Sequence, residues 1–354
     1  MKATPKYQKI KESILEKIQG GKLQTDEQLP SVEYYMEKFD VSAITVRRAL
    51  SELAEEGYIR RIKRKGTFVN DPGSFEASSH LIAVILSTED YYDTSYMEII
   101  KGAQSFISEY DYSLLIEWTD LDNEQERASV QRMLDKKVDG FIIYPFDPVK
   151  SENIFCLIEK ENIPYVLVDR YNLHHPCYFS GSDNYSGAIL ATSKLIEFKH
   201  TKIKFAAYHF FLPSEQERYD GFCSAMRAHN LDVSADNLLI DIDYDDLKQK
   251  IISHEVTALF CVNDRLALKI MSRLTELGVR IPEDVSIIGF DDWDNARNKT
   301  SGLSTVRQYF NEIGSNAAYL LISAIQGQLQ GRNVKMLAGV TLVERDSVIE
   351  NPYA

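Results

Sequence analysis

A regular alternation of short apolar runs with longer amphipathic segments begins near residue 81 and continues past residue 290. Each run has the length of a buried strand, and each segment between runs is long enough for a helix that packs on it. The alternation therefore predicts an α/β fold with parallel sheets covered by helices on both faces. The predicted strands are Leu81–Leu86, Leu114–Trp118, Gly140–Tyr144, Pro164–Val168, Lys202–Ala207, Ala258–Val262 and Ser286–Phe290.

A stretch that fits neither a helix nor a strand precedes this alternation. Residues 71–74 (DPGS) and 77–79 (ASS) break both periodicities. We therefore expect a small domain at residues 1–70, a linker at residues 71–79 and a large domain at residues 80–354.

Charge is distributed unevenly between these two domains. The chain has a formal net charge of −13, yet residues 1–70 hold 14 Lys and Arg against 10 Asp and Glu. The remaining residues hold 26 basic side chains against 43 acidic ones. A basic end on an acidic protein suggests that this end alone meets a polyanion such as DNA. The alternative is a chance clustering of solvated charges.

Other features of the sequence argue against a secreted, membrane-anchored or metal-binding protein. No apolar run approaches the ~20 residues that span a bilayer, and residues 1–18 are amphipathic, so we expect a cytoplasmic chain. His174, His175 and His209 have no carboxylate or cysteine at ligand spacing, so we expect no metal and no cofactor. Four cysteines form no C-x-x-C pair and are interpreted as reduced core residues. They are Cys156, Cys177, Cys223 and Cys261.

Helical periodicity and capping residues predict two helices at the start of the small domain. Apolar residues from Tyr7 to Ile18 recur at helical spacing, and Gly20 ends this first helix. Ser31 is a suitable N-cap for a second helix that runs to about Phe39.

A third helix and a hairpin follow after a short turn. Ser42 is placed to cap the third helix, and Gly57 ends it. Residues 58–62 and 67–69 can then pair as a hairpin around a basic tip. The buried stripe of the third helix consists of Val46, Ala49, Leu50 and Leu53.

The open side of the third helix and the hairpin tip carry the candidate DNA-binding residues. A short helix that follows a tight turn and exposes two arginines has the geometry of a recognition helix in a major groove. Five cations within residues 60–65 suit contacts with phosphate. The alternative is that Arg47 and Arg48 pair with Glu52 and Glu55. The candidates are Ser42, Ile44, Thr45, Arg47, Arg48, Lys63, Arg64, Lys65, Gly66 and Thr67.

Residues 29–59 read LPSVEYYMEKFDVSAITVRRALSELAEEGYI, and KGTFV follows at residues 65–69. Over residues 5–69 the chain resembles the GntR family of winged-helix repressors, because helix, turn, helix and wing occur in order. Family members usually carry arginines where this chain has Glu33 and Ala43, so base contacts tied to those arginines do not carry over. Ile44 is apolar and opposite the buried stripe, which suits contact with a thymine methyl group or packing against the second helix.

The large domain carries the ordered motifs KKVDGFII, IPYVLVDR, SDNYSGA, ERYDGF, FCVNDRLAL, IPEDVSIIGFDD and LSTVRQ. These motifs resemble the effector domain of the LacI/GalR repressors, which is related to periplasmic sugar-binding proteins. The resemblance implies a type I periplasmic-binding-protein-like fold with parallel sheets, in which two subdomains joined by three crossings close on a ligand. It places the crossings near residues 171–182, 298–303 and 320. Subdomain one is then expected at about residues 80–171 and 303–319, and subdomain two at about residues 182–298 and 320–354.

Polar side chains at the ends of predicted strands are the candidate ligand-binding residues. Asp169, Asn263 and Asp291, for example, each follow such a strand directly. A polyol offers paired donors and acceptors, which carboxylate, amide and guanidinium groups match, and its apolar faces can stack on aromatic rings. The resemblance places family ligand contacts at the same positions. The candidates are Tyr91, Tyr96, Asp169, Arg170, Arg218, Asn263, Asp291, Trp293 and Gln308.

Structural alternatives stand beside these candidates. The polar residues could brace the strand ends, and the aromatic residues, with Tyr92 among them, could anchor loops. Asp183 and Asn184 are expected to fix a turn or cap a helix. Asp264 is placed either to cap a helix or to bind ligand, and Asp292 is placed to contact the backbone.

Together these patterns predict a ligand-responsive transcriptional repressor of sugar-utilisation genes that binds double-stranded operator DNA as a homodimer. A GntR-type head on a LacI-type body resembles the arabinose-responsive repressors, which implies a sugar effector with L-arabinose first. Another mono- or disaccharide, or a nucleoside, is the alternative.

Two rival functions fit part of the sequence. Asp169 and Asp291 could be the paired carboxylates of a sugar-active enzyme, but the chain lacks G-x-S-x-G, P-loop, G-x-G-x-x-G and H-E-x-x-H motifs, so we expect no enzyme. A transport binding protein would share the fold of the large domain. The DNA-binding domain and the lack of a signal segment argue against it.

Overall fold

Two compact units make up the chain, Met1–Ser79 and His80–Ala354. The computed structural model describes residues 5–62, 66–70, 79–88, 93–208, 212–292, 302–329 and 333–354. The predicted linker lies outside the described residues except for Ser79. The predicted DNA-binding residues Lys63, Arg64 and Lys65 also lie outside them.

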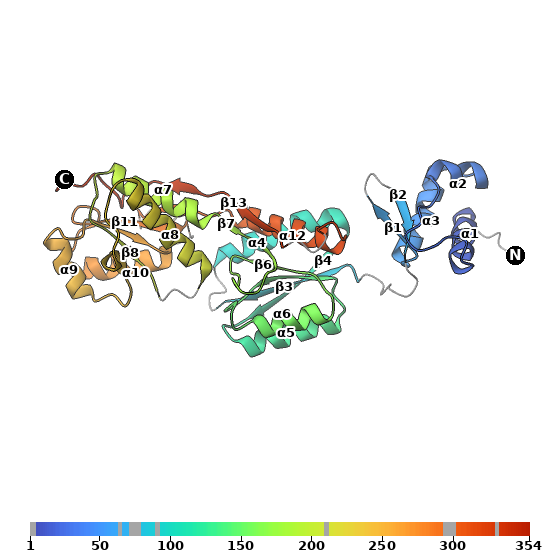
Figure 1. The fold of residues 1–354 in the computed structure, drawn as a ribbon, viewed down its shortest axis with the longest axis horizontal. Coiled ribbons are helices and arrows are strands. Elements are labelled where there is room, and N and C mark those ends of the chain that lie inside the picture. The colour runs from blue at the N-terminus through green and yellow to red at the C-terminus, as the bar shows by residue number, and fades with distance from the viewer. Residues whose placement is uncertain are drawn as a thin grey trace. The chain divides into compact units, whose positions relative to one another are not determined.

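The first unit consists of three helices and a hairpin, as the sequence predicts (Figure 1). Apolar side chains of these elements form one core, in which Ile10 and Ile14 of the first helix are buried together with Val46 and Leu50 of the third. The elements are α1 (Lys6–Gln19), α2 (Val32–Phe39), α3 (Ala43–Glu55), β1 (Ile59–Ile62) and β2 (Gly66–Val69).

A tight turn joins α2 to α3. The hydroxyl oxygen of Ser31 caps α2 by accepting a hydrogen bond from the Tyr34 N–H at 3.4 Å, and Asp40 ends α2 with a φ of 48°. Ser42 holds the N-cap position of α3, but its hydroxyl lies 3.1 Å from the hydroxyl of Thr45 and does not cap the helix backbone. Ser42 therefore occupies the predicted N-cap position, but its side chain does not make the hydrogen bond expected of a cap.

The first subdomain of the second unit is a six-stranded sheet in which every pair of neighbours is parallel. Helices α4 (Thr94–Ile107) and α12 (Phe310–Ile325) cover one face, and α5 (Asn123–Asp135) and α6 (Glu152–Lys160) cover the other (Figure 1). In order across the sheet, the strands are β13 (Lys335–Ala338), β7 (Tyr178–Ser182), β6 (Tyr165–Val168), β5 (Gly140–Tyr144), β3 (Leu81–Ser87) and β4 (Ser113–Thr119).

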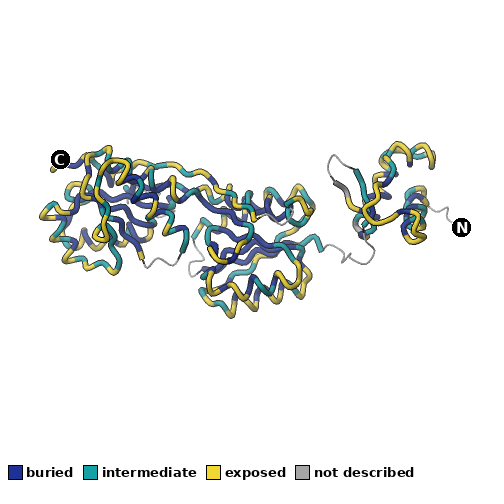
Figure 2. The backbone as a smooth tube through the Cα atoms, in the orientation of Figure 1, coloured by how far each residue is buried: buried dark blue, intermediate teal, exposed yellow. Residues whose placement is uncertain are grey.

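The second subdomain is another six-stranded sheet, parallel except for its edge strand β14. Its order is β14 (Thr341–Val343), β12 (Ser304–Arg307), β11 (Ser286–Asp291), β10 (Ala258–Cys261), β8 (Ile203–Ala206) and β9 (Leu238–Leu239). Its helices are α7 (Asn184–Glu197), α8 (Pro213–Ala228), α9 (Tyr244–Ile252) and α10 (Asp264–Glu276). The inner strands of both sheets are mostly buried, the edge strands β4, β9, β13 and β14 are partly exposed, and the helices expose their outer sides (Figure 2).

The first crossing follows Ser182, at the end of the implied range, because β7 pairs with β6 in the first sheet. The other two crossings lie elsewhere than the resemblance implied. Because β12 pairs with β11 in the second sheet, the chain returns to the first subdomain at Gln308 and Tyr309, not at residues 298–303. The last crossing lies between β13 and β14, at residues 339–340 instead of near 320, because the apolar face of α12 is buried in the core of the first subdomain.

Helices α4 and α12 approach each other backbone to backbone. A Cβ added to Gly314 would lie 2.0 Å from the carbonyl oxygen of Ile99, and one added to Gly102 would lie 1.9 Å from that of Asn311. Glycine at both positions therefore permits the close contact. This contact fixes the N-terminal turn of α4, which contributes to the site described next.

Candidate functional site

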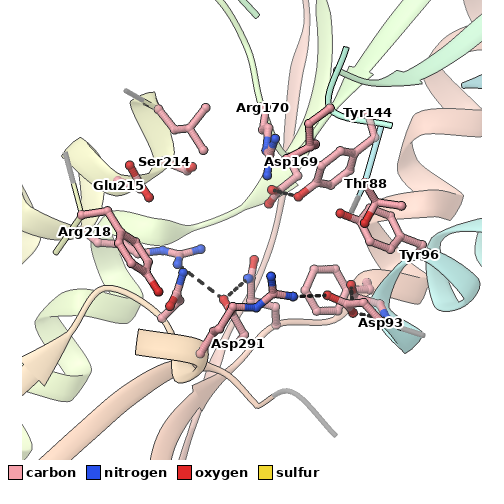
Figure 3. Close-up of a pocket in the computed structure, with 18 residues that line it drawn as sticks. Thr88, Asp93, Tyr96, Tyr144, Asp169, Arg170, Ser214, Glu215, Arg218 and Asp291 are labelled. Atoms are coloured by element: carbon pink, nitrogen blue, oxygen red, sulfur yellow. Dashed lines mark hydrogen bonds and ion pairs between the residues drawn. The ribbon is translucent and has the colours of Figure 1, made fainter. Parts of the chain in front are cut away.

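A cavity of about 550 Å³ lies between the two subdomains. Its lining residues follow the carboxyl ends of strands in both sheets, the edge at which open α/β sheets bind ligands. Figure 3 shows side chains converging on it from both sides. The predicted ligand residues that line it are Tyr96, Asp169, Arg170, Arg218, Asn263, Asp291 and Gln308.

Arg218 places a buried positive charge at the base of α8. Its Nε donates to Asn184 Oδ1 at 2.9 Å, and one Nη donates to the carbonyl oxygen of Val262 at 2.8 Å. The guanidinium lies 3.9 Å from the ring centroid of Phe290. These contacts hold the side chain in one orientation, as a buried cation requires.

Asp291 ends β11 beside this arginine. Its Oδ1 accepts a hydrogen bond from Gln308 Nε2 at 2.6 Å and lies 3.4 Å from Nη1 of Arg218. Burial raises the pKa of the Asp291 carboxyl to about 7, Arg218 opposes the rise and Asp169 adds to it. The residue also has a φ of 121°, a strained conformation of the kind that clusters at binding sites.

Asp169 and Arg170 reach the cavity from the first subdomain, directly after β6. The hydroxyl of Tyr144 donates to Asp169 Oδ2 at 2.9 Å, and Arg170 donates to the carbonyl oxygen of Phe146 at 2.7 Å. The Arg170 guanidinium lies 4.8 Å from the Tyr144 ring centroid. The aspartate has a φ of 63°. This side of the cavity thus repeats the combination of carboxylate, guanidinium and ring seen around Arg218.

Three buried polar atoms of the lining have no hydrogen-bond partner among the residues that the structure describes. They are Asp169 Oδ1, Arg170 Nε and Gln308 Oε1. A buried polar atom without a partner is costly, so such atoms cluster where a ligand supplies the missing bond. Two of the three are acceptors and one is a donor, which matches the hydroxyl groups of a polyol.

Asn263 has a different role from its neighbours. Its Oδ1 accepts a hydrogen bond from the Leu266 N–H at 2.9 Å and caps α10. Only its amide nitrogen therefore remains for a ligand, so the residue combines the predicted ligand position with a structural role.

Aromatic rings line the cavity, but only one of them was predicted. Tyr96 is buried and packs against Tyr144, with ring centroids 5.0 Å apart. The sequence analysis missed Tyr144, Tyr208 and Phe310, although Tyr144 ends a predicted strand. Tyr91, Tyr92 and Trp293 lie outside the described residues.

Charged residues that the sequence analysis did not select complete the lining. Asp93 caps α4 and lies 3.9 Å from Arg265 of the opposite subdomain (Figure 3). Glu215 contributes a further carboxylate from α8. Their only sequence signal was proximity to strand ends, which many surface residues share.

The four acidic or amide residues with structural alternatives divide as follows. Asp183 caps α7, as predicted, by accepting a hydrogen bond from the Ser186 N–H. Asp264 is instead an acceptor for the hydroxyl of Thr305. Asp292 pairs with Arg307 at 2.7 Å and with Arg345 at 2.6 Å, a role that the sequence did not predict. Asn184 bridges Arg218 and Glu217, and its amide also donates locally to the carbonyl oxygen of Ser182 at 3.2 Å.

The third helix of the first unit exposes part of the predicted DNA-binding set. Ile44 is 77% exposed, which rules out packing against α2 as its role. Ser42 and Arg47 are exposed as well, and Thr45 is half-buried. This face is therefore accessible to the edges of bases in a major groove.

Arg48 follows the structural alternative instead. Its Nε lies 3.3 Å from Glu52, and its guanidinium lies 4.0 Å from the ring centroid of Tyr7 on α1. Pairing with Glu52 is the alternative to DNA contact that the sequence offered for both Arg47 and Arg48. Arg48 thus braces α3 against α1.

The hairpin is tied to the chain that precedes α2. The Leu29 N–H donates to the carbonyl oxygen of Thr67 at 2.7 Å, and Arg60 pairs with Asp26 and Asn70. Gly66 has a φ of 126° and lies against Gln28, so a side chain there would be both strained and crowded. Thr67 and Gly66 are half-buried.

Within the described ranges, no helix is long and apolar enough to cross a membrane. No three His, Cys, Asp or Glu side chains gather there as metal ligands. All four cysteines are described and none forms a disulfide. Cys223 and Cys261 are buried, as expected of core residues, whereas Cys156 and Cys177 are only half-buried.

Family models match both units. The model of bacterial regulatory proteins of the gntR family matches residues 6–69, and that of the periplasmic binding protein-like domain matches residues 192–348. The predicted combination of a GntR-type head with a periplasmic-binding-protein-like body is therefore confirmed.

Relatives of known function extend this result. The arabinose metabolism transcriptional repressor of Geobacillus stearothermophilus is 29% identical over 99% of this chain and 99% of its own. The HTH-type transcriptional repressor PurR of Vibrio vulnificus is 32% identical over 72% of this chain and 77% of its own. The chain belongs to the HTH-type transcriptional repressors. The repressor is thus a DNA-binding regulator and not an enzyme.

A solved structure agrees with the fold of the repressor. A LacI-family transcriptional regulatory protein from Corynebacterium glutamicum matches it with a TM-score of 0.59 and 26% identity, covering 77% of this chain and 99% of that one. The effector fold predicted from the LacI/GalR resemblance is confirmed.

The different settings of Arg47 and Arg48 predict different effects on DNA binding. Arg47→Ala should weaken binding to the operator about 5- to 100-fold, and weaken binding to random DNA less, because a base contact carries sequence information. Arg48→Ala should mainly lower the melting temperature of the first unit. Fluorescence anisotropy with a duplex selected from a random pool measures both affinities. If Arg47→Ala lost the same factor of affinity for the operator and for random DNA, Arg47 would not contribute to sequence recognition.

Proposed function

We propose that a small neutral sugar, with L-arabinose first, binds in the cavity and controls the affinity of the repressor for operators of sugar-utilisation genes. The cavity supports this proposal because paired carboxylate, guanidinium and amide groups reach it from both subdomains. Such groups bind the hydroxyls of a polyol, and the rings of Tyr96 and Tyr208 can stack on its apolar faces. A repressor of such genes acts on DNA in the cytoplasm.

Arabinose is preferred over other sugars because relatives that match nearly the whole chain are repressors of arabinose metabolism. The repressor of arabinose metabolism matches the chain over both units and almost the full length of each protein. A shared effector domain alone would not favour one sugar, because sugar-responsive and other regulators share this fold. Other sugars and nucleosides are therefore outcomes of the test below.

The site residues divide between the two subdomains, which supports a closure mechanism. Asp169 and Arg170 belong to the first, and Arg218 and Asp291 to the second. A sugar that contacts both sets binds the closed form more tightly than the open one. This difference in affinity is what allows a ligand to shift a conformational equilibrium.

A panel of sugars tests the proposed effector. L-arabinose should stabilise the wild-type chain by about 4 kcal/mol at a thousandfold excess over its dissociation constant. The melting temperature should therefore rise, and it should rise more with L-arabinose than with D-ribose, D-glucose or adenosine. Asp291→Asn should lose this response and keep sugar-free operator binding, because the variant removes the charge and keeps the shape.

Asp284→Asn is the matched control, because Asp284 also pairs with an arginine, Arg280, but lies outside the cavity. It should respond to L-arabinose as the wild type does. A normal response in Asp291→Asn would place the site elsewhere, and no shift with any sugar would contradict a sugar effector.

We also propose that the repressor is a homodimer that pairs through α4 and β4. Met97 on α4 is 44% exposed and Ile116 on β4 is 42% exposed. Ile116 lies on the face of the sheet that α4 covers, because it is the register partner of Val84 in that core. Exposed apolar side chains beside an edge strand favour contact with another chain.

Sedimentation velocity tests the dimer. The wild type should sediment as a dimer, and Ile116→Lys should shift it to a monomer because a charge would be buried in the interface. Leu190→Lys, at a similarly exposed position on α7 (43%), should remain a dimer. A monomeric wild type with and without DNA would contradict the proposal, and a dimeric Ile116→Lys would exclude this surface.

A further inference from the structure

Tyr171 lies in the first subdomain, in the segment between β6 and β7, directly after Arg170. Its ring is buried in the core of the first subdomain, 4.6 Å from the Phe179 ring between centroids. The ammonium group of Lys335, on β13 near the last crossing, lies 3.6 Å from the centroid of the Tyr171 ring. The ring is therefore held firmly by its own subdomain.

The hydroxyl of Tyr171 leaves that core and contacts the other subdomain. It donates a hydrogen bond to Glu217 Oε1 at 2.6 Å, and Glu217 lies on α8. Burial, together with this carboxylate, raises the pKa of Tyr171, so the hydroxyl stays protonated and donates. Glu217 directly precedes Arg218 in the sequence.

From Glu217 the hydrogen bonds continue to the cavity. Its Oε2 accepts from Asn184 Nδ2 at 3.1 Å, and Asn184 Oδ1 accepts from Arg218 Nε at 2.9 Å. Arg218 then lies against Asp291. An unbroken chain of hydrogen bonds thus joins the first subdomain to an arginine that lines the cavity from the second.

We propose that Tyr171, Glu217 and Asn184 form a relay that orients Arg218 according to the angle between the subdomains, with Glu217 as a positioning residue for effector binding. This inference rests on the proposed effector site. Among the hydrogen bonds of this chain, the one between Tyr171 and Glu217 crosses between subdomains, so a rotation of one against the other changes it first. The bonds behind it transmit that change to the guanidinium, because Asn184 is itself buried.

Removal of a single hydroxyl tests the relay. Tyr171→Phe keeps the ring in its core and should weaken L-arabinose binding about tenfold, as expected for a lost hydrogen bond to a charged group. Tyr165→Phe is the matched control, because the Tyr165 hydroxyl also donates to a glutamate, Glu159 at 2.9 Å, but within the first subdomain. The control should bind sugar within twofold of the wild type.

Glu217 supplies a second comparison. Glu217→Ala should weaken sugar binding as much as Tyr171→Phe does, and the double variant should be no weaker, because both changes break the same chain. Glu217→Gln should restore most of the affinity, since an amide can accept from Asn184 and donate to Tyr171. Sugar-free operator affinity should be unchanged in every variant. Isothermal calorimetry and anisotropy measure these quantities, and equal sugar affinities of Tyr171→Phe and Tyr165→Phe would overturn the relay.

Hydrogen exchange of the sugar-free protein separates failure of the relay from failure of the proposed effector. Peptides that cover residues 184–190 and 216–222 should exchange at least threefold faster in Tyr171→Phe than in the wild type, and at the wild-type rate in Tyr165→Phe. A wild type that binds no sugar of the panel contradicts the proposed function. The relay then stands if this difference in exchange is found and is overturned if it is not.

Discussion

The guanidinium of Arg218 is largely shielded from water, and a buried charge is tolerated only when its donors are paired. Its partners come from separate segments: Asn184 opens α7, Val262 follows β10, and Asp291 ends β11. Their contacts with the Arg218 guanidinium hold these three segments together at the carboxyl edge of the second sheet. The cavity therefore has a rigid wall on that side, against which a movable first subdomain can close.

Function depends on how that wall is connected to the rest of the chain. Asp169 and Arg170 face it from the first subdomain, and the proposed closure would change the distance between the two sets through the crossing segments. The DNA-binding unit follows a simpler principle, since one apolar core fixes α3 and leaves Ile44 and Arg47 exposed. In the proposed mechanism, effector specificity and operator specificity are set by different residues, and a change of conformation couples them.

Sequence patterns predicted the elements of both units well, because strands buried on both faces and helices with apolar stripes leave clear periodicities. They did not predict β7, whose residues 178–182 (YFSGS) lack an apolar run, the strand β12, or the short edge strands β9, β13 and β14. This is why two crossings were misplaced. Asp169 and Asp291 were selected from their positions after strands, whereas Tyr144 and Asp93 depend on tertiary placement. The role of Arg48 was likewise settled by a neighbour distant in sequence, Tyr7, whereas Asn263 caps α10 through the Leu266 N–H only three residues away.

The central claim is that sugar in the cavity and operator on α3 are energetically coupled. Titration of operator with and without saturating sugar, and of sugar with and without operator, measures this coupling in both directions. The account predicts that sugar lowers operator affinity by at least tenfold and that operator lowers sugar affinity by the same factor, because linkage is reciprocal. Sugar that binds tightly but leaves operator affinity unchanged would contradict it.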